Sequence, residues 1–156
     1  MGSAKADLKA RHGYEDDYVG WLNEQAALLR AGELDALDRE NIAEELESLG
    51  RSDRRALSSH LEVVMLHMLK MHMQPALRTR SWKLSLNASR KAVEDILEDS
   101  PSLRRQLPAL MTRHYKRAMD RAVDETMLAE AAFPKTPPFS LDQVLGEEVF
   151  PPEEYD

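Results

Sequence analysis

Apolar residues recur at steps of three and four along most of this 156-residue chain, and no stretch alternates apolar and polar residues in period two. The first spacing places apolar side chains on one face of an α-helix, whereas strands need the second. The 6 glycines and 8 prolines fall mainly between the periodic segments. The sequence therefore predicts an all-α fold, an antiparallel bundle of about five helices with an extended Pro-rich C-terminal tail.

Capping residues set the limits of the expected segments. Asp16 or Asp17 can cap the first helix, which ends at Gly32, and Ser100-Pro101 restarts the chain into the fifth. Pro108 lies too deep for a first-turn proline, so it predicts a kink or a break. The expected helices cover residues 14–32, 38–49, 53–73, 81–98 and 101–127.

Three regions follow from this pattern. Residues 1–13 are predicted to form a disordered or frayed arm, 14–133 the helical bundle domain, and 134–156 a Pro-rich acidic tail packed on the bundle. A short helix over 140–146 is expected in the tail, because Ser140 and Gln143 have the spacing of a capping box and Gly146 can end the helix.

The segment around Gly50 is predicted to reverse the chain. Gly50 would end one helix and Ser52 would cap the next, which makes an antiparallel hairpin. Glu47 would then pair with Arg55.

Charge is segregated along the chain. Residues 14–50 hold eleven carboxylates and two arginines, and 51–91 hold nine cations and two carboxylates. One interpretation is neutralisation within a bundle, and another is a protein-partner face. A third is a nucleic-acid or phosphate-binding surface around Trp82, although a net charge of −7 is unlike that of most such proteins. Its candidate residues are Arg78, Arg80, Lys83, Arg90 and Lys91.

The composition excludes several kinds of chemistry. The chain has no cysteine, so disulfides and thiolate metal sites are excluded. Glycine-rich nucleotide loops and serine-nucleophile motifs are missing, so no cofactor is expected. No apolar stretch approaches the roughly 20 residues of a membrane span, and the N-terminus has no apolar core of a signal peptide. A soluble cytoplasmic protein without membrane contact is expected.

A metal site could still come from histidine and carboxylate. No two histidines lie four apart, and no Glu-x-x-His occurs, so ligands would have to come from different helices. The candidates are His67 with Glu44 or Glu45. The alternative for His67, which lies among apolar residues, is a buried histidine with an internal hydrogen bond. The methionines from Met65 to Met73 similarly indicate core more than a partner groove.

The string Asn41-Ile-Ala-Glu-Glu-Leu-Glu-Ser-Leu-Gly50-Arg-Ser-Asp-Arg-Arg-Ala-Leu57 is distinctive. With the later His67-Met-Leu-Lys70, Gln74-Pro75, Arg80-Ser-Trp82 and Pro101-Ser-Leu103, it resembles the bacterial family known as domain of unknown function twenty-nine. The resemblance covers roughly 14–152 and implies a compact helical protein with no assigned activity; His72 stands where the family tends to an aromatic. The polar positions that match the family are Glu44, Glu45, Glu47, His67, Lys70, Arg80, Trp82 and Arg90.

These observations favour a non-enzymatic protein-interaction or regulatory protein, with a protein partner and a possible homodimer through Trp21, the methionines or the tail. A nucleic-acid-associated protein using the basic 78–91 segment is the first alternative. A metal-dependent enzyme with an inter-helix His/Glu site is the second.

Overall fold

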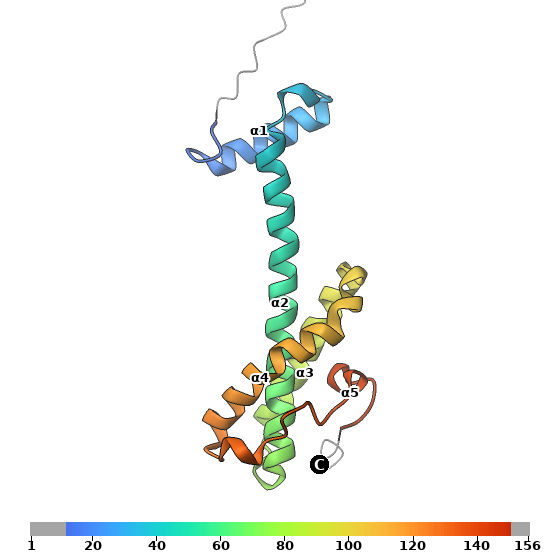
Figure 1. Ribbon diagram of the computed structural model, residues 1–156. Helices are drawn as coiled ribbons and strands as arrows, with labels where there is room; N and C mark the ends of the chain where they lie inside the picture. Colours follow the sequence, from blue (N-terminus) through green and yellow to red (C-terminus); the bar gives the residue numbers. More distant parts are fainter. Residues whose placement is uncertain (1–11, 151–156) are drawn as a thin grey trace, which may run out of the picture. The chain divides into compact units, whose positions relative to one another are not determined.

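The computed structural model describes residues 12–150, and within that range the fold is all-α, with five α-helices and no strand. Short 3-10 turns (η) join the helices (Figure 1). The helices are α1 (Tyr18–Ala31), α2 (Arg39–Met73), α3 (Arg80–Asp99), α4 (Leu107–Thr126) and α5 (Leu141–Leu145). This confirms the predicted fold class. The arm expected at 1–13 and the end of the tail fall largely outside the described residues.

The predicted hairpin at Gly50 is wrong. Residues 39–73 form one uninterrupted helix of 35 residues, with Gly50 in its interior (Figure 1). Gly50 does not take the left-handed conformation seen at Gly32 and Gly146. Glycine inside a helix costs about 1 kcal/mol, which does not end a helix whose other residues favour it. The expected pair of Glu47 and Arg55 is absent because both lie on this helix, and Glu47 contacts Arg51 instead.

Other local predictions are confirmed. Asp17 caps α1 by accepting the Gly20 N–H, and Gly32 ends that helix at a φ of 74°. Ser140 and Gln143 form the capping box of α5. Pro108 breaks the fifth predicted helix: residues 101–106 form the 3-10 turn η3, and α4 starts at Leu107, so the proline lies in its first turn. There its missing N–H costs no hydrogen bond.

Contacts divide the chain into two compact units, Met1–Arg51 and Ser52–Asp156. The first contains α1, the turn η1 (Leu34–Ala36) and the first turns of α2. Its buried residues are few: Trp21, Gln25 and Leu28 are the ones of α1. A unit with so small a core leaves most of its leucines at the surface.

The second unit holds the main core. The later turns of α2 contribute its centre, including the fully buried Leu57, Leu61 and Met65. Met68 and Met71 are also buried, so the methionines are core residues, as predicted. Side chains of α3 and α4 pack against them, and so do Phe133, Phe139, Val144 and Phe150 from the segment after α4. That segment is further fixed by Tyr115, whose hydroxyl donates to the Pro134 carbonyl at 2.6 Å.

Candidate functional site: an apolar groove in an acidic segment

Asp38, just before α2, joins the two helices of the first unit. Its backbone N–H donates to the buried Gln25 side chain at 2.8 Å. Its carboxylate accepts from the Trp21 indole N–H at 3.1 Å and from the Asn41 amide at 2.8 Å. The bonds from Asn41 and Trp21 hold the pKa of Asp38 below its usual range. The two contacts with Trp21 and Gln25 therefore set the position of α1 against the start of α2, and the contact with Asn41 fixes the Asp38 carboxylate.

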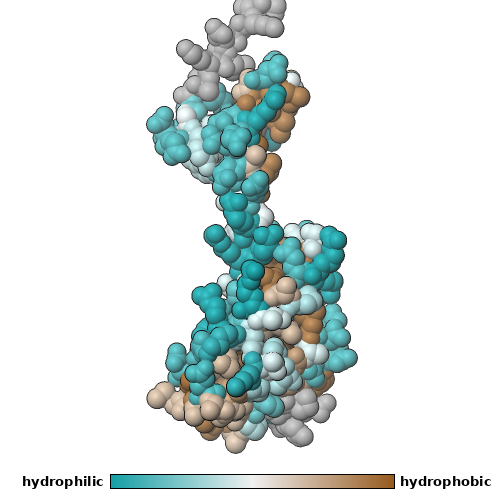
Figure 2. All heavy atoms as spheres, viewed as in Figure 1, coloured by the Kyte–Doolittle hydropathy of each residue, from teal (hydrophilic) through white to brown (hydrophobic). Residues whose placement is uncertain are grey.

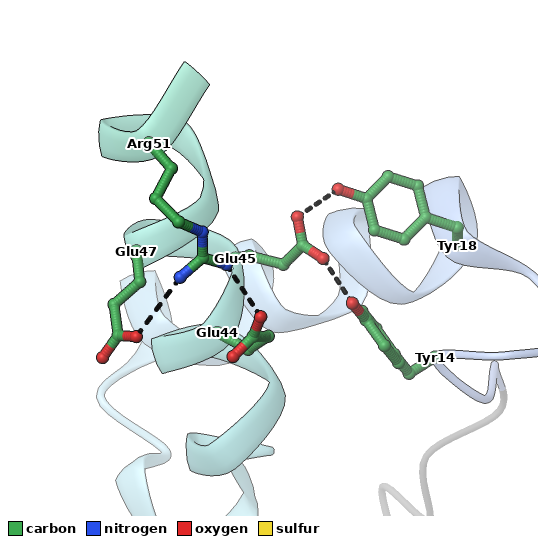
Figure 3. Close-up of polar contacts among 6 residues, drawn as sticks. All are labelled: Tyr14, Tyr18, Glu44, Glu45, Glu47 and Arg51. Atoms are coloured by element: carbon green, nitrogen blue, oxygen red, sulfur yellow. Dashed lines mark hydrogen bonds and ion pairs between the residues drawn. The ribbon is translucent and has the colours of Figure 1, made fainter. Parts of the chain in front are cut away.

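Glu45 is held by two tyrosines. Tyr14 donates to one carboxylate oxygen and Tyr18 to the other, each at 2.5 Å (Figure 3). The bond to Glu45 raises the pKa of Tyr14 to about 12, and the bonds from Tyr14 and Tyr18 lower the pKa of Glu45. Both tyrosine rings also contact Trp21, with the Tyr14 ring centroid 4.8 Å from that of the indole. The Glu45 side chain is thus fixed beside an aromatic cluster.

The neighbouring glutamates point elsewhere. Arg51 contacts Glu44 at 2.9 Å and Glu47 at 3.7 Å, on a different side of α2 from the tyrosines (Figure 3). Adjacent helical residues differ by about 100° in direction, so Glu44 and Glu45 do not converge. Because all three partners are well exposed, these ion pairs contribute about 0–1 kcal/mol each. Their effect is to support the helix on both sides of Gly50.

An apolar groove of about 190 Å³ lies between α1 and α2 in this unit. Trp21 and Glu45 line it, together with the aliphatic side chains of Leu22, Ala26, Leu29, Ile42, Leu46 and Leu49. Leu46 and Leu49 are each 65% exposed. Figure 2 shows hydrophobic side chains gathered on one side of this unit, next to hydrophilic ones. The helical spacing of Leu46 and Leu49 is typical of core residues, so their exposure marks a surface that a partner could cover.

In the second unit the structure brings together three positions of the family motif. The Lys70 ammonium, on a side chain only 9% exposed, contacts Glu125 at 2.6 Å and lies 4.4 Å from the centroid of the Trp82 ring. His67 precedes Lys70 by one helical turn, and its buried Nδ1 has no hydrogen-bond partner among the described residues. Burial, and then the charge of Lys70, lower the pKa of His67. The cluster is a packed junction of α2, α3 and α4.

The metal hypothesis depended on the hairpin. Glu44, Glu45 and His67 lie on one helix, 22 or 23 residues apart, so no chain reversal brings either glutamate back against the histidine. Glu44 pairs with Arg51, and Glu45 accepts from the tyrosines. Within residues 12–150, no group of three potential ligands could hold a metal ion.

The basic segment 78–91 has mixed surroundings. Arg90 donates to the carbonyls of Gln143 at 2.6 Å and Val144 at 3.0 Å, near the end of α5. Lys91 contacts Asp95 at 2.8 Å and Glu94 at 3.4 Å. The exposed Arg80 begins α3. Arg78 and Lys83 line a second, smaller cavity with Arg90.

Sequence reasoning missed several of these contacts. Tyr14 and Tyr18 are four residues apart, the spacing of one helix face, and this was the available signal for a shared partner. No sequence signal pointed to Glu125 as the partner of Lys70, or to α5 as the partner of Arg90, because both contacts join residues more than 50 positions apart.

Among the comparisons with known proteins, a match was found to a family model and to nothing else. No curated protein and no solved structure matches the chain. No helix in residues 12–150 is long and apolar enough to span a bilayer. The family model described as "Domain of unknown function DUF29" matches residues 14–150, which include the tyrosine pair, the groove and the Lys70 cluster. The chain therefore belongs to the DUF29 family.

Proposed function

We propose that this chain is a bacterial cytoplasmic protein that acts by binding a protein partner, and that its groove between α1 and α2 takes a basic amphipathic helix. The observation that carries the proposal is the row of exposed leucines along the groove. Burying a leucine side chain stabilises a complex by about 1.5–3 kcal/mol. A helix with apolar residues at i, i+3, i+4 and i+7 would cover such a row.

Charge selects the kind of helix. Residues 14–50 carry eleven carboxylates and two arginines, a net charge of −9. The net negative charge of the segment that holds the groove favours a partner with lysine or arginine beside its apolar face, and it speeds the partner's association. The same charge disfavours pairing of two copies through this face, because two acidic surfaces would meet.

Glu45 gives the groove a fixed anionic group. The two tyrosine hydroxyls limit its rotation, so it would pair with a partner cation at a smaller loss of conformational entropy. It would therefore define the register of the partner helix.

Defined peptides test the proposal on the full chain. A helical peptide of repeating leucine and lysine and its leucine–glutamate counterpart would be titrated against the Trp82→Phe variant, so that Trp21 in the groove supplies the fluorescence. We expect the basic peptide to bind at least roughly tenfold more tightly. We also expect Leu46→Ser with Leu49→Ser to weaken binding by roughly tenfold or more, since two apolar contacts are lost.

The matched control is Leu77→Ser with Leu84→Ser, two leucines of similar exposure outside the groove. Equal binding of the two peptides, or equal loss in both double variants, would overturn the proposal. Concentration-dependent dimerisation that Leu46→Ser and Leu49→Ser abolish would identify a second copy as the occupant instead. Cell fractionation checks the cytoplasmic location.

A further inference from the structure

A cavity of about 480 Å³ lies in the second unit, between α3, η3 and the end of α5. Small-molecule sites have volumes of about 300–1,000 Å³. The apolar surface of the cavity consists of Val93 and Leu97, which are buried, and Leu145, which is partly buried against the core. The polar and charged residues that line it are Asn87, Arg90, Lys91, Glu94, Arg104 and Glu147. The cavity therefore combines an aliphatic surface with charges of both signs.

The α5 wall of this cavity is held in place by Arg90. The guanidinium group donates to the carbonyls of Gln143 at 2.6 Å and Val144 at 3.0 Å. Gly146 also lines the cavity; it has a φ of 81°, and a Cβ added there would lie 3.2 Å from Arg90 Cδ. A residue without a side chain thus allows the backbone after α5 to approach α3 closely. Arg90 is a positioning residue, because its donors hold this wall rather than an occupant.

A loose ion pair borders the apolar surface on the side of η3 and α5. Arg104 Nη1 lies 3.7 Å from Glu147 Oε1, and the two side chains are 59% and 57% exposed. Neither side chain has a closer ionic partner among residues 12–150. A separation of this size is too long for a hydrogen bond, and ion pairs with such exposure are weak. Arg104 and Glu147 can therefore move apart and each bind a charged group of an occupant.

The chemistry of the pair matches a free α-amino acid. A guanidinium group binds a carboxylate through two parallel hydrogen bonds, and a carboxylate such as Glu147 accepts from an ammonium group. In an amino acid both charged groups are attached to one carbon, so they can reach two adjacent side chains at once. The side chain on the same carbon would then lie against the aliphatic surface, which favours an apolar one. A peptide, by contrast, separates its terminal charges by at least one peptide unit.

We propose that this cavity binds a free aliphatic α-amino acid, with Arg104 holding its carboxylate and Glu147 its ammonium group. One loose ion pair is replaced by two charge-assisted contacts, so the charges of the protein stay compensated. The ligand has no net charge, in agreement with a lining of three cations and two carboxylates. The site gives the second unit a small-molecule ligand of its own, independently of the groove in the first unit.

Titration of the full chain with leucine, followed by NMR of the backbone amides, tests the proposal. We expect a dissociation constant of roughly 1 mM or below, with the shifted amides centred on Arg104 and residues 145–147. N-acetylleucine lacks the ammonium charge and leucinamide lacks the carboxylate, so each should bind at least roughly tenfold more weakly. Serine should also bind more weakly, because its side chain buries little apolar surface. No binding of leucine, or equal binding of leucine and N-acetylleucine, would overturn the proposal.

Two charge-removing variants locate the binding groups. Arg104→Gln and Glu147→Gln should each weaken leucine binding by roughly tenfold or more, because each removes one charged hydrogen bond. The matched controls are Arg105→Gln and Glu148→Gln, which change the adjacent exposed residues of the same charge outside the cavity. Both controls should bind leucine like the wild type, and an equal loss in variant and control would contradict the assignment.

The analogues and the variants together assign each contact. Arg104→Gln should leave the weaker binding of leucinamide unchanged, because leucinamide has no carboxylate for Arg104 to hold. By the same reasoning, Glu147→Gln should leave the binding of N-acetylleucine unchanged. The opposite pattern would show that the ligand does not lie between these two side chains as proposed. Near-ultraviolet circular dichroism verifies the fold of each variant, and we expect no change because both side chains are exposed.

Discussion

The ammonium group of Lys70 lies 4.4 Å from the ring centroid of Trp82, and the same group contacts Glu125 at 2.6 Å. A lysine buried to this degree is stable as a cation only where charge and ring electrons replace its lost water. The contact joins α2 to α3 and α4, so two positions of the family motif have a structural role at the centre of the second unit.

Substitution of Lys70 tests this role. Lys70→Ala should lower the free energy of unfolding by about 2 kcal/mol, because it removes a charged hydrogen bond, a cation–π contact and apolar packing. Lys70→Met should cost less than half as much, since it keeps the aliphatic chain and Glu125 is partly exposed. Urea unfolding followed by Trp82 fluorescence in the Trp21→Phe background measures both. An equal loss of unfolding free energy in Lys70→Ala and Lys70→Met would show that the charge of Lys70, rather than the packing of its aliphatic chain, makes the larger contribution to stability.

The stability of the second unit should fall as the solution becomes acidic. His67 has a pKa below its usual value, so between the folded and unfolded values the unfolded chain binds more protons. The contribution of His67 to the free energy of unfolding is therefore complete above about pH 6.5, the ordinary pKa of histidine. It is lost as the pH falls through the lowered pKa of His67 in the folded protein. The groups that act on it are Lys70, Arg121 and the opposing Glu125.

The variant His67→Gln should reduce this pH dependence. Thermal unfolding gives the melting temperature of each protein at pH 8 and at pH 5. We expect the melting temperature to differ less between the two pH values in the variant than in the wild type. The same difference in both proteins would contradict the assignment to His67.

Gly146 is placed against Arg90. It has a φ of 81°, and an added Cβ would lie 3.2 Å from Arg90 Cδ. Gly32 has a similar φ of 74° with open space around it. Gly32→Ala should therefore cost about 1 kcal/mol from backbone strain alone, and Gly146→Ala about 2 kcal/mol. In the Arg90→Ala background, Gly146→Ala should cost no more than Gly32→Ala, because the contact with Arg90 is gone. A double-mutant cycle of Gly146→Ala and Arg90→Ala measures this excess cost. An unchanged excess would assign it to another neighbour.

Gly50 distinguishes a continuous helix from a hairpin. It lies inside α2, and a Cβ added to it would meet open space, so Gly50→Ala should stabilise the helix by about 1 kcal/mol. A left-handed cap at this position would instead make alanine destabilising. Circular dichroism during urea unfolding gives the sign, and a loss of stability would contradict the continuous helix.

The tyrosine pair can be titrated directly. Glu45→Gln removes the negative charge that favours the protonated phenol, so the pKa of Tyr14 should fall from about 12 toward its ordinary value near 10. Tyrosinate absorbance measures the shift, and Tyr14→Phe identifies the transition. Tyr115 should keep its raised pKa of about 12 in both variants, because burial is its cause. If Glu45→Gln leaves the pKa of Tyr14 unchanged, the Glu45 carboxylate is not the hydrogen-bond partner of Tyr14.

The sequence by itself determined the helical class and the limits of the helices other than α2. The cap at Asp16 or Asp17, the ends at Gly32 and Gly146, the kink or break at Pro108 and the capping box at Ser140 all depend on residues within four positions of one another. Such effects act through nearby backbone groups, so a sequence pattern is sufficient to find them.

Only the tertiary structure decided the course of the chain at Gly50 and the exposure of Leu46 and Leu49. A helix stop and a tolerated helical glycine have the same sequence pattern, and their free energies differ by about 1 kcal/mol. The same limit applies to Tyr14 with Glu45, Lys70 with Glu125 and Arg90 with α5. Each of these contacts joins residues far apart in the chain, so its partner is set by how the helices pack rather than by any local spacing.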